Sequence, residues 1–181
     1  MTISKMTSAA GFWTRRLLSE GYCVIPDVLD PAILRKLDGD LAGNFRDTPF
    51  CRGGFYGERT KRFGRLLIRT DLARLLVQHP LILAITDNVL GPWCDRIQLN
   101  LTQAVAVHPG ALAQFPHRDQ DMWRGEIGKV EYLVNVMWPF TDYRRENGAT
   151  LIWPRSHGRK ALSPEPDSEP VAIEASPGSA I

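Results

Sequence analysis

The hydrophobic pattern of this 181-residue chain changes near residue 93, and the change restricts the folds open to it. Before this point, apolar residues recur at helical spacing between signals that begin and end helices. After it, apolar residues alternate with polar ones in the period of a strand. Helices followed by strands predict an α+β domain whose strands form a sandwich or jelly roll. The face of the first long strand carries Ile97, Leu99, Leu101, Gln103, Val105 and Val107.

The helix predictions rest on caps, prolines and glycines. Asp30 is a favourable N-cap, Pro31 suits the first helical position, and Leu29 can pack on Leu34 across the helix start. Gly21 suits the position that follows a helix. The predicted helices cover Gly11–Glu20, Pro31 to about Ala42, Thr70–Gln78, and Pro80 to just before Gly91.

Residues 50–69 are predicted to form a basic loop, because four glycines are interleaved with six cations and one acid. Two roles are open for its stretch from Arg52 to Arg69. It is either an ordinary solvated loop or a segment that covers the site and attracts an anionic substrate. Short strands are expected at Tyr22–Ile25, Val130–Trp138, Ala149–Trp153 and Val171–Ala175.

The composition is that of a soluble globular protein with one domain, at 44% hydrophobic and 23% charged residues. A net charge of +2 falls short of the basic excess that binding to nucleic acid requires. The three cysteines are widely spaced and predict neither a disulfide framework nor a zinc site, which fits a cytoplasmic protein. No apolar run has the length of a signal peptide or a membrane span.

An H-x-D triplet, His117-Arg118-Asp119, closely follows the long strand. On an extended backbone residues i and i+2 point to the same face, so an imidazole nitrogen and a carboxylate oxygen can reach one ion. One further histidine would complete the 2-His-1-carboxylate triad, which leaves positions open on iron(II) for co-substrate and oxygen. The alternative is an exposed His beside an Asp that forms only a surface pair.

Four segments around this triplet carry a family resemblance. In order and spacing, Gly21–Pro31, Asn135–Asp142, Glu146–Thr150 and Pro154–His157 closely resemble the phytanoyl-CoA dioxygenase family. The resemblance implies a double-stranded β-helix, a cupin-like jelly roll formed by residues 93–181, with a mainly helical flank at residues 1–92. It also implies an enzyme that uses iron(II), 2-oxoglutarate and O2 to hydroxylate a small molecule.

The resemblance further implies that His117 and Asp119 are metal ligands. The family's third ligand, a histidine, and its 2-oxoglutarate-binding arginine lie in later strands. We therefore expect both beyond Ile181, and we expect the C-terminal core strands to be missing from this chain, with residues 179–181 beginning a partner strand for Val171–Ala175. Asp119 itself favours hydroxylation, because related halogenases have a small residue there. Arg155 is a departure, since many relatives have glycine at that position.

Other candidate residues carry two interpretations each. Gln103 and Asn135 are polar residues within apolar patterns, so each is a buried amide bonded to backbone or a group that binds the co-substrate carboxylate. Large apolar residues near the triplet line the substrate pocket or belong to the core: Trp123, Met122 and Trp138. The remaining histidines, His157 of the Ser-His turn, His108 and His79, are expected to make local hydrogen bonds.

Two rival functions remain open. One is a non-catalytic jelly-roll module that binds a ligand or partner, because fold does not determine function. The other is a cupin-type metal enzyme that does not use 2-oxoglutarate. Neither the substrate nor the oligomeric state follows from the sequence.

Overall fold

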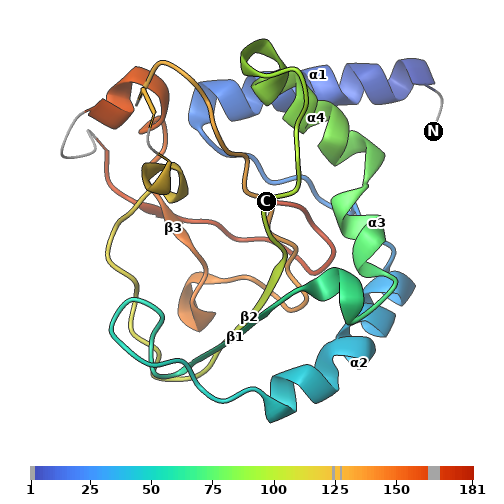
Figure 1. Ribbon diagram of the computed structural model, residues 1–181, viewed down its shortest axis with the longest axis vertical. Helices are drawn as coiled ribbons and strands as arrows, with labels where there is room; N and C mark the ends of the chain where they lie inside the picture. Colours follow the sequence, from blue (N-terminus) through green and yellow to red (C-terminus); the bar gives the residue numbers. More distant parts are fainter. Residues whose placement is uncertain (1–2, 124, 127, 163–167) are drawn as a thin grey trace.

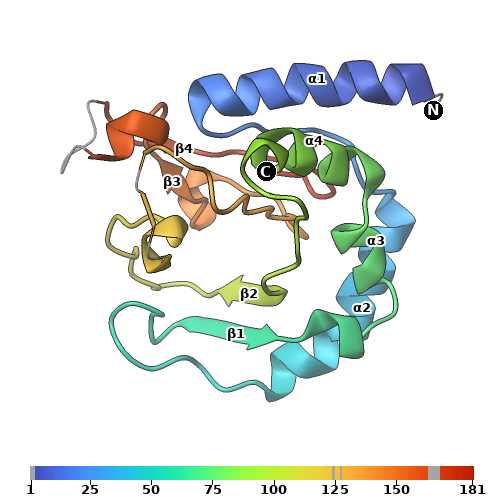
Figure 2. The same ribbon diagram turned by 45° about the horizontal axis from the view of Figure 1, so that its top comes forward.

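The computed structural model of the chain describes residues 3–123, 125–126, 128–162 and 168–181. Its architecture is mixed α and β, with helices along two sides and short strands on the others (Figure 1, Figure 2). The helices are α1 (Ile3–Glu20), α2 (Pro31–Asp47), α3 (Ala73–Val77) and α4 (Pro80–Leu90). The strands β1 (Thr60–Gly64) and β2 (Gln103–Val107) form one antiparallel sheet, and β3 (Leu151–Ile152) and β4 (Val171–Ala172) form another. Single 3-10 turns are η1 (Leu66–Ile68), η2 (Gly91–Trp93), η3 (Asp119–Met122), η4 (Arg145–Asn147) and η5 (Gly158–Leu162).

The start of α2 confirms the predicted cap. Asp30 Oδ1 accepts a hydrogen bond from the backbone N–H of Ala32 at 2.6 Å, and Pro31 occupies the first helical turn. Leu29 and Leu34 lie in one buried cluster, as the predicted packing across the helix start requires. The sequence signal at this helix start is therefore sufficient to position α2.

The other helices agree with the predictions to different extents. Helix α4 has the predicted bounds, and α1 ends at Glu20, followed by Gly21, whose φ of 82° is the left-handed conformation that glycine favours. Helix α1 begins at Ile3, earlier than predicted, whereas α3 is shorter than the predicted Thr70–Gln78. The Thr70 hydroxyl accepts from the backbone N–H of Leu72 at 3.2 Å, as the predicted cap requires, and donates to Asp40 Oδ2 at 2.6 Å, which ties this turn to α2. In the described part of the chain, no helix combines the length and apolarity that crossing a membrane requires.

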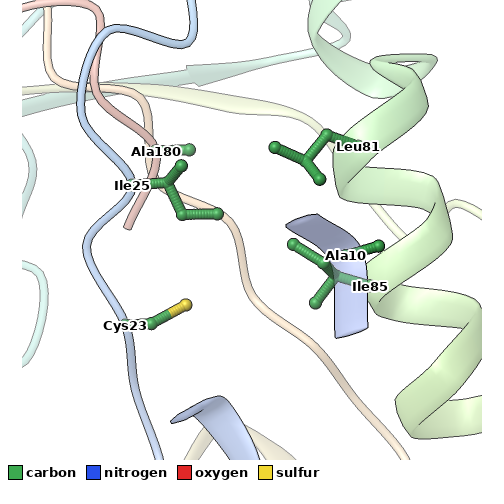
Figure 3. Close-up of a cluster of buried hydrophobic side chains, with 6 residues drawn as sticks. All are labelled: Ala10, Cys23, Ile25, Leu81, Ile85 and Ala180. Carbon is green, nitrogen blue, oxygen red and sulfur yellow. The ribbon is translucent and has the colours of Figure 1, made fainter. Parts of the chain in front are cut away.

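Helices α1 and α4 enclose one of the buried clusters (Figure 3). Ala10 of α1 faces Leu81 and Ile85 of α4, and the segment after α1 contributes Cys23 and Ile25, with Ala180 alongside. Burial raises the pKa of the Cys23 thiol, while the charge of Arg16 acts more weakly in the opposite direction. Cys23 therefore behaves as an apolar packing group rather than as a reactive thiol.

The prediction that residues 50–69 form a loop is wrong for Thr60–Gly64, which form β1. The strand pairs with β2 and buries Phe63 against Phe45 of α2, with ring centroids 4.7 Å apart. Lys61 Nζ donates to the carbonyl oxygens of Phe45 and Arg46 at 2.8 and 3.1 Å. A cation there stabilises the C-terminal end of α2, which extends to Asp47 rather than the predicted Ala42.

The long strand predicted from residue 97 is confirmed only at Gln103–Val107. Strand β1 ends at Gly64, which pairs with Gln103, so the residues before Gln103 have no partner in β1. Within β2 the small Ala104 side chain packs against the buried cluster that contains Phe63. The opposite face carries larger apolar side chains that are exposed, with Val105 at 44%, Val107 at 51% and the preceding Leu101 at 62%. We call Leu101, Val105 and Val107 the apolar face.

The later strands are much shorter than predicted. Residues 130–138 contain no strand, although Met137 exchanges two backbone hydrogen bonds with Ile181, each of 2.9 Å. The predicted strands Ala149–Trp153 and Val171–Ala175 reduce to β3 and β4. Tyr22–Ile25 reduces to a single bridge between Ile25 and Ala180. The prediction that residues 179–181 begin a partner strand for Val171–Ala175 is wrong, because Ala180 pairs with Ile25 and Ile181 pairs with Met137. Extended residues form strands here only where a partner backbone lies beside them.

Arg155, the departure from the family pattern, has a φ of 58°. Its backbone N–H donates to Glu20 O at 2.7 Å, and its guanidinium bonds Glu20 Oε2 at 3.2 Å. Glycine adopts this left-handed conformation more readily than arginine does.

We expect Arg155→Gly to raise the free energy of unfolding by about 0.5 kcal/mol, because relief of the left-handed conformation exceeds the loss of an exposed ion pair. Arg155→Ala keeps the strain and loses the pair, so it should lower the free energy by about 0.5–1 kcal/mol. Urea unfolding of the two variants measures both effects. Equal stabilities of the glycine and alanine variants would contradict this explanation.

Candidate metal centre

His117 and Asp119 lie on the segment after β2, at the start of η3. Arg118 between them has φ −116° and ψ 129°, an extended conformation that directs its two neighbours to the same side. His117 Nε2 lies 3.6 Å from Asp119 Oδ1. The local backbone therefore brings an imidazole nitrogen and a carboxylate oxygen together.

The hydrogen bond on the other ring nitrogen determines which nitrogen of His117 is available to a metal. Nδ1 lies 2.9 Å from the carbonyl oxygen of Phe115. Because a carbonyl only accepts, Nδ1 donates in this bond, and in the neutral imidazole the lone pair is then on Nε2. The Phe55 ring packs edge-on against the imidazole at 4.9 Å and helps to fix its plane. Nε2 is thus presented toward Asp119 in the form that binds metals.

Asp119 has a partner on each carboxylate oxygen. Oδ1 faces His117, and Oδ2 accepts a hydrogen bond of 2.7 Å from Asn135 Nδ2. Two ligands at right angles on metal bonds of about 2.1 Å lie about 3 Å apart, so the 3.6 Å separation needs only a small closure. An N donor and an O donor at this separation fit two positions of a divalent iron site.

Within the described ranges, no group of three His, Cys, Asp or Glu side chains could hold a metal ion. The local hydrogen bonds expected of the other histidines are wrong for His157, whose partner is distant in sequence, and for His79, whose Nδ1 is buried without a partner in the described part of the chain. His157 Nε2 bonds the Leu18 carbonyl at 2.9 Å, His108 packs edge-on against Phe50, and His79 packs against Trp138 at the start of α4. None of the three lies in a group with the His117–Asp119 pair.

The structure separates the other predicted site residues. Gln103 and Asn135 are both exposed, so the interpretation of each as a buried amide is wrong. Gln103 Oε1 accepts from Arg62 Nη1 at 3.4 Å. Trp123 is half-exposed just after η3, whereas Trp138 packs against the clusters under α2 and α4. The Met122 side chain lies outside the described part of the chain.

Sequence reasoning missed two residues that frame His117. Phe55 packs on the imidazole, and Gln114 Nε2 donates to the Phe55 carbonyl at 2.8 Å. Gln114 stands three residues before His117, which is a detectable local signal. Phe55 is distant in sequence and lies in the segment read as a loop, so no local pattern identifies it.

Comparison with known proteins gives one family. The family model described as Phytanoyl-CoA dioxygenase (PhyH) matches residues 17–181. The matched range includes His117, Asp119 and Asn135, and every described strand.

Curated relatives carry dioxygenase names. The chain is 29% identical to dioxygenase aneA of Aspergillus aculeatus over 78% of its own length and 51% of that protein. It is 35% identical to dioxygenase FrzG of a Cladobotryum species, over 56% of this chain and 35% of that protein. It is 27% identical to multifunctional dioxygenase prhA of Penicillium brasilianum, over 76% of this chain and 49% of that protein. The chain thus spans about half or less of the length of these relatives.

Proposed function

Because the chain belongs to the phytanoyl-CoA dioxygenase family, we propose that its protein is an iron(II)- and 2-oxoglutarate-dependent dioxygenase that hydroxylates a small organic molecule. The observation that carries the proposal is the 3.6 Å approach of His117 Nε2 to Asp119 Oδ1 on a matched segment. The dioxygenase names of the relatives support it.

In this proposal His117 and Asp119 hold the iron. Bound iron and 2-oxoglutarate would supply the oxidation of a substrate C–H bond by dioxygen, with succinate and carbon dioxide as co-products. The Phe115 carbonyl keeps the proton on Nδ1 of His117, so that Nε2 stays available to the metal. Asp119 contributes one negative charge, and two neutral histidines and one carboxylate leave three positions open.

The third histidine is proposed to lie beyond Ile181, on strands that cover the apolar face. Leu101, which precedes β2, and Val105 and Val107 of β2 are exposed, and exposed apolar residues gathered on one face of a sheet usually mark a surface that another segment covers. The relatives extend well beyond the matched length. The jelly roll remains part of this proposal, since further strands would add to the two small sheets.

We propose that Gln103 and Arg62 help to bind the co-substrate carboxylate, together with the arginine expected beyond Ile181. Asn135, whose amide donates to Asp119, is proposed to act on Asp119 rather than on the co-substrate. Arg62 and Gln103 lie on the same face of the β1–β2 sheet, and Arg62 Nε is buried without a hydrogen-bond partner. A guanidinium with an unpaired donor suits a carboxylate. Trp123 remains the proposed pocket residue because it is half-exposed beside η3.

We expect Arg62→Gln to raise KM for 2-oxoglutarate by about 10-fold, the loss of roughly 1.4 kcal/mol of a charge-assisted hydrogen bond. Arg52→Gln removes a cation from the same basic segment and should leave KM unchanged. Steady-state kinetics at two salt concentrations separates local binding from long-range attraction. Equal KM values for the two variants and the unmodified protein would exclude this role.

The proposed activity is tested by measuring succinate in protein that includes the third histidine. We expect succinate only when iron(II), 2-oxoglutarate and oxygen are all present. Oxygen consumption without succinate would favour the cupin-type enzyme that does not use 2-oxoglutarate. Ligand binding with neither product would favour the non-catalytic module.

A further inference from the structure

Asn135 approaches the candidate metal centre from a separate segment of the chain. Its Nδ2 donates to Asp119 Oδ2 at 2.7 Å, while Oδ1 of the same carboxylate faces His117 Nε2 at 3.6 Å. The two oxygens therefore have different partners. The neighbouring cation, Arg118, does not compete for the Asp119 carboxylate, because its Nε donates to Asp121 Oδ1 and Oδ2 at 3.2 and 3.3 Å.

An amide donor on one oxygen has two physical consequences for a metal ligand. The terminal torsion of an aspartate is broad and roughly two-fold, so a carboxylate that is 46% exposed rotates readily unless a partner holds it. The hydrogen bond fixes the carboxylate plane and directs Oδ1 toward His117 Nε2. It also occupies a lone pair of Oδ2, which favours binding through one oxygen and keeps further metal positions open.

The segment that carries Asn135 is anchored independently of Asp119. Met137 exchanges backbone hydrogen bonds with Ile181, and Val136 and Trp138 pack against the cluster between α1 and α4. The backbone on either side of Asn135 is therefore held by the core rather than by the segment that carries Asp119. Such support is what a preorganised site requires.

We propose that Asn135 is a positioning residue that fixes Asp119 as a one-oxygen metal ligand facing His117. The proposal rests on the proposed iron site and deepens it. A residue with this role controls metal affinity and coordination without touching the substrate.

The test compares cobalt(II) binding by the unmodified protein with Asn135→Leu, which keeps the size and removes the donor, and Asn135→Gln, which keeps a donor. Calorimetry gives the affinity, and the visible absorption of cobalt(II) reports its coordination. We expect about 10–100-fold weaker binding and an altered spectrum for the leucine variant, with partial recovery for glutamine. The thermal midpoint of the metal-free protein should be the same in all three. Asn88→Leu, which removes an amide between α4 and α1, is the matched control and should keep full affinity.

Two further variants separate this inference from the site on which it rests. If His117→Ala and Asp119→Ala abolish cobalt(II) binding while Asn135→Leu leaves affinity and spectrum unchanged, the role of Asn135 is refuted and the metal site stands. If neither His117→Ala nor Asp119→Ala affects binding, the metal site itself is refuted. If Asn135→Leu loses affinity only in proportion to a lowered thermal midpoint of the metal-free protein, Asn135 has a structural role and the proposal that it positions Asp119 is refuted.

Discussion

Replacing His117 with alanine is expected to remove succinate formation and to weaken iron(II) binding by more than 100-fold. Changes to residues that only orient a metal ligand typically cost about 10–100-fold in affinity or activity, so losing a ligand should cost more. Iron(II) titration under anaerobic conditions and a succinate assay measure the two effects. Asp119→Ala should behave in the same way, because its Oδ1 lies 3.6 Å from His117 Nε2.

The matched control for this prediction is His108→Ala. His108 follows β2 on the same connecting segment and packs edge-on against Phe50, so its loss leaves the candidate ligands intact. The control should retain metal binding and turnover. Turnover by His117→Ala at the level of the control would show that the ligand assignment is wrong.

Replacing Leu37 with alanine is expected to lower the free energy of unfolding by about 2–5 kcal/mol. Leu37 of α2 is 0% exposed at the centre of the cluster that also contains Leu29, Leu34 and Leu76. Removing its side-chain carbons leaves a cavity that helices α2 and α3 cannot fill by small shifts. Urea denaturation monitored by circular dichroism measures the loss.

Leu83→Ala is the matched control for Leu37→Ala. Leu83 lies on α4 and is 40% exposed, so the same substitution should cost less than about 1 kcal/mol. Similar losses for the two variants would contradict the assignment of the cluster around Leu37 as the core that holds α2.

The helices could be predicted because their signals are local. Asp30 and Pro31 begin α2, Pro80 begins α4, and Gly21 ends α1, and each acts within one helical turn. Helix α2 extends to Asp47, beyond the predicted Ala42, because Phe45 packs against Phe63 of β1. The local sequence pattern does not indicate this strand. Glycines and cations around Thr60–Gly64 indicated a loop, whereas pairing with β2 makes this segment a strand.

The strands were harder to predict because a strand requires a partner that sequence alternation does not identify. The alternation of apolar and polar residues predicts a strand that begins at Ile97, yet only Gln103–Val107 have a partner in β1. Alternation also indicated which side chains share a face but not which face is covered. Val105 and Val107 are exposed while Ala104 packs inward.

Part of the candidate site follows from sequence spacing, and part requires the fold. The i, i+2 spacing of His117 and Asp119 predicts two donors on one side of the chain, and the extended Arg118 meets that condition. The bond from Asn135 to Asp119 joins residues on separate segments, and Phe55 reaches His117 from farther still. Spacing could not identify either contact, because both depend on tertiary packing.

The central claim is that His117 and Asp119 bind iron(II) together, and anomalous diffraction tests it most directly. Crystals of the protein would be soaked anaerobically with iron(II) and 2-oxoglutarate and measured at the iron absorption edge. We predict one anomalous peak at about 2.1 Å from both His117 Nε2 and one Asp119 oxygen, with Asn135 bonded to the other oxygen. An iron peak that lies within bonding distance of neither residue, or the absence of any peak at this position at saturating iron(II), would contradict the claim.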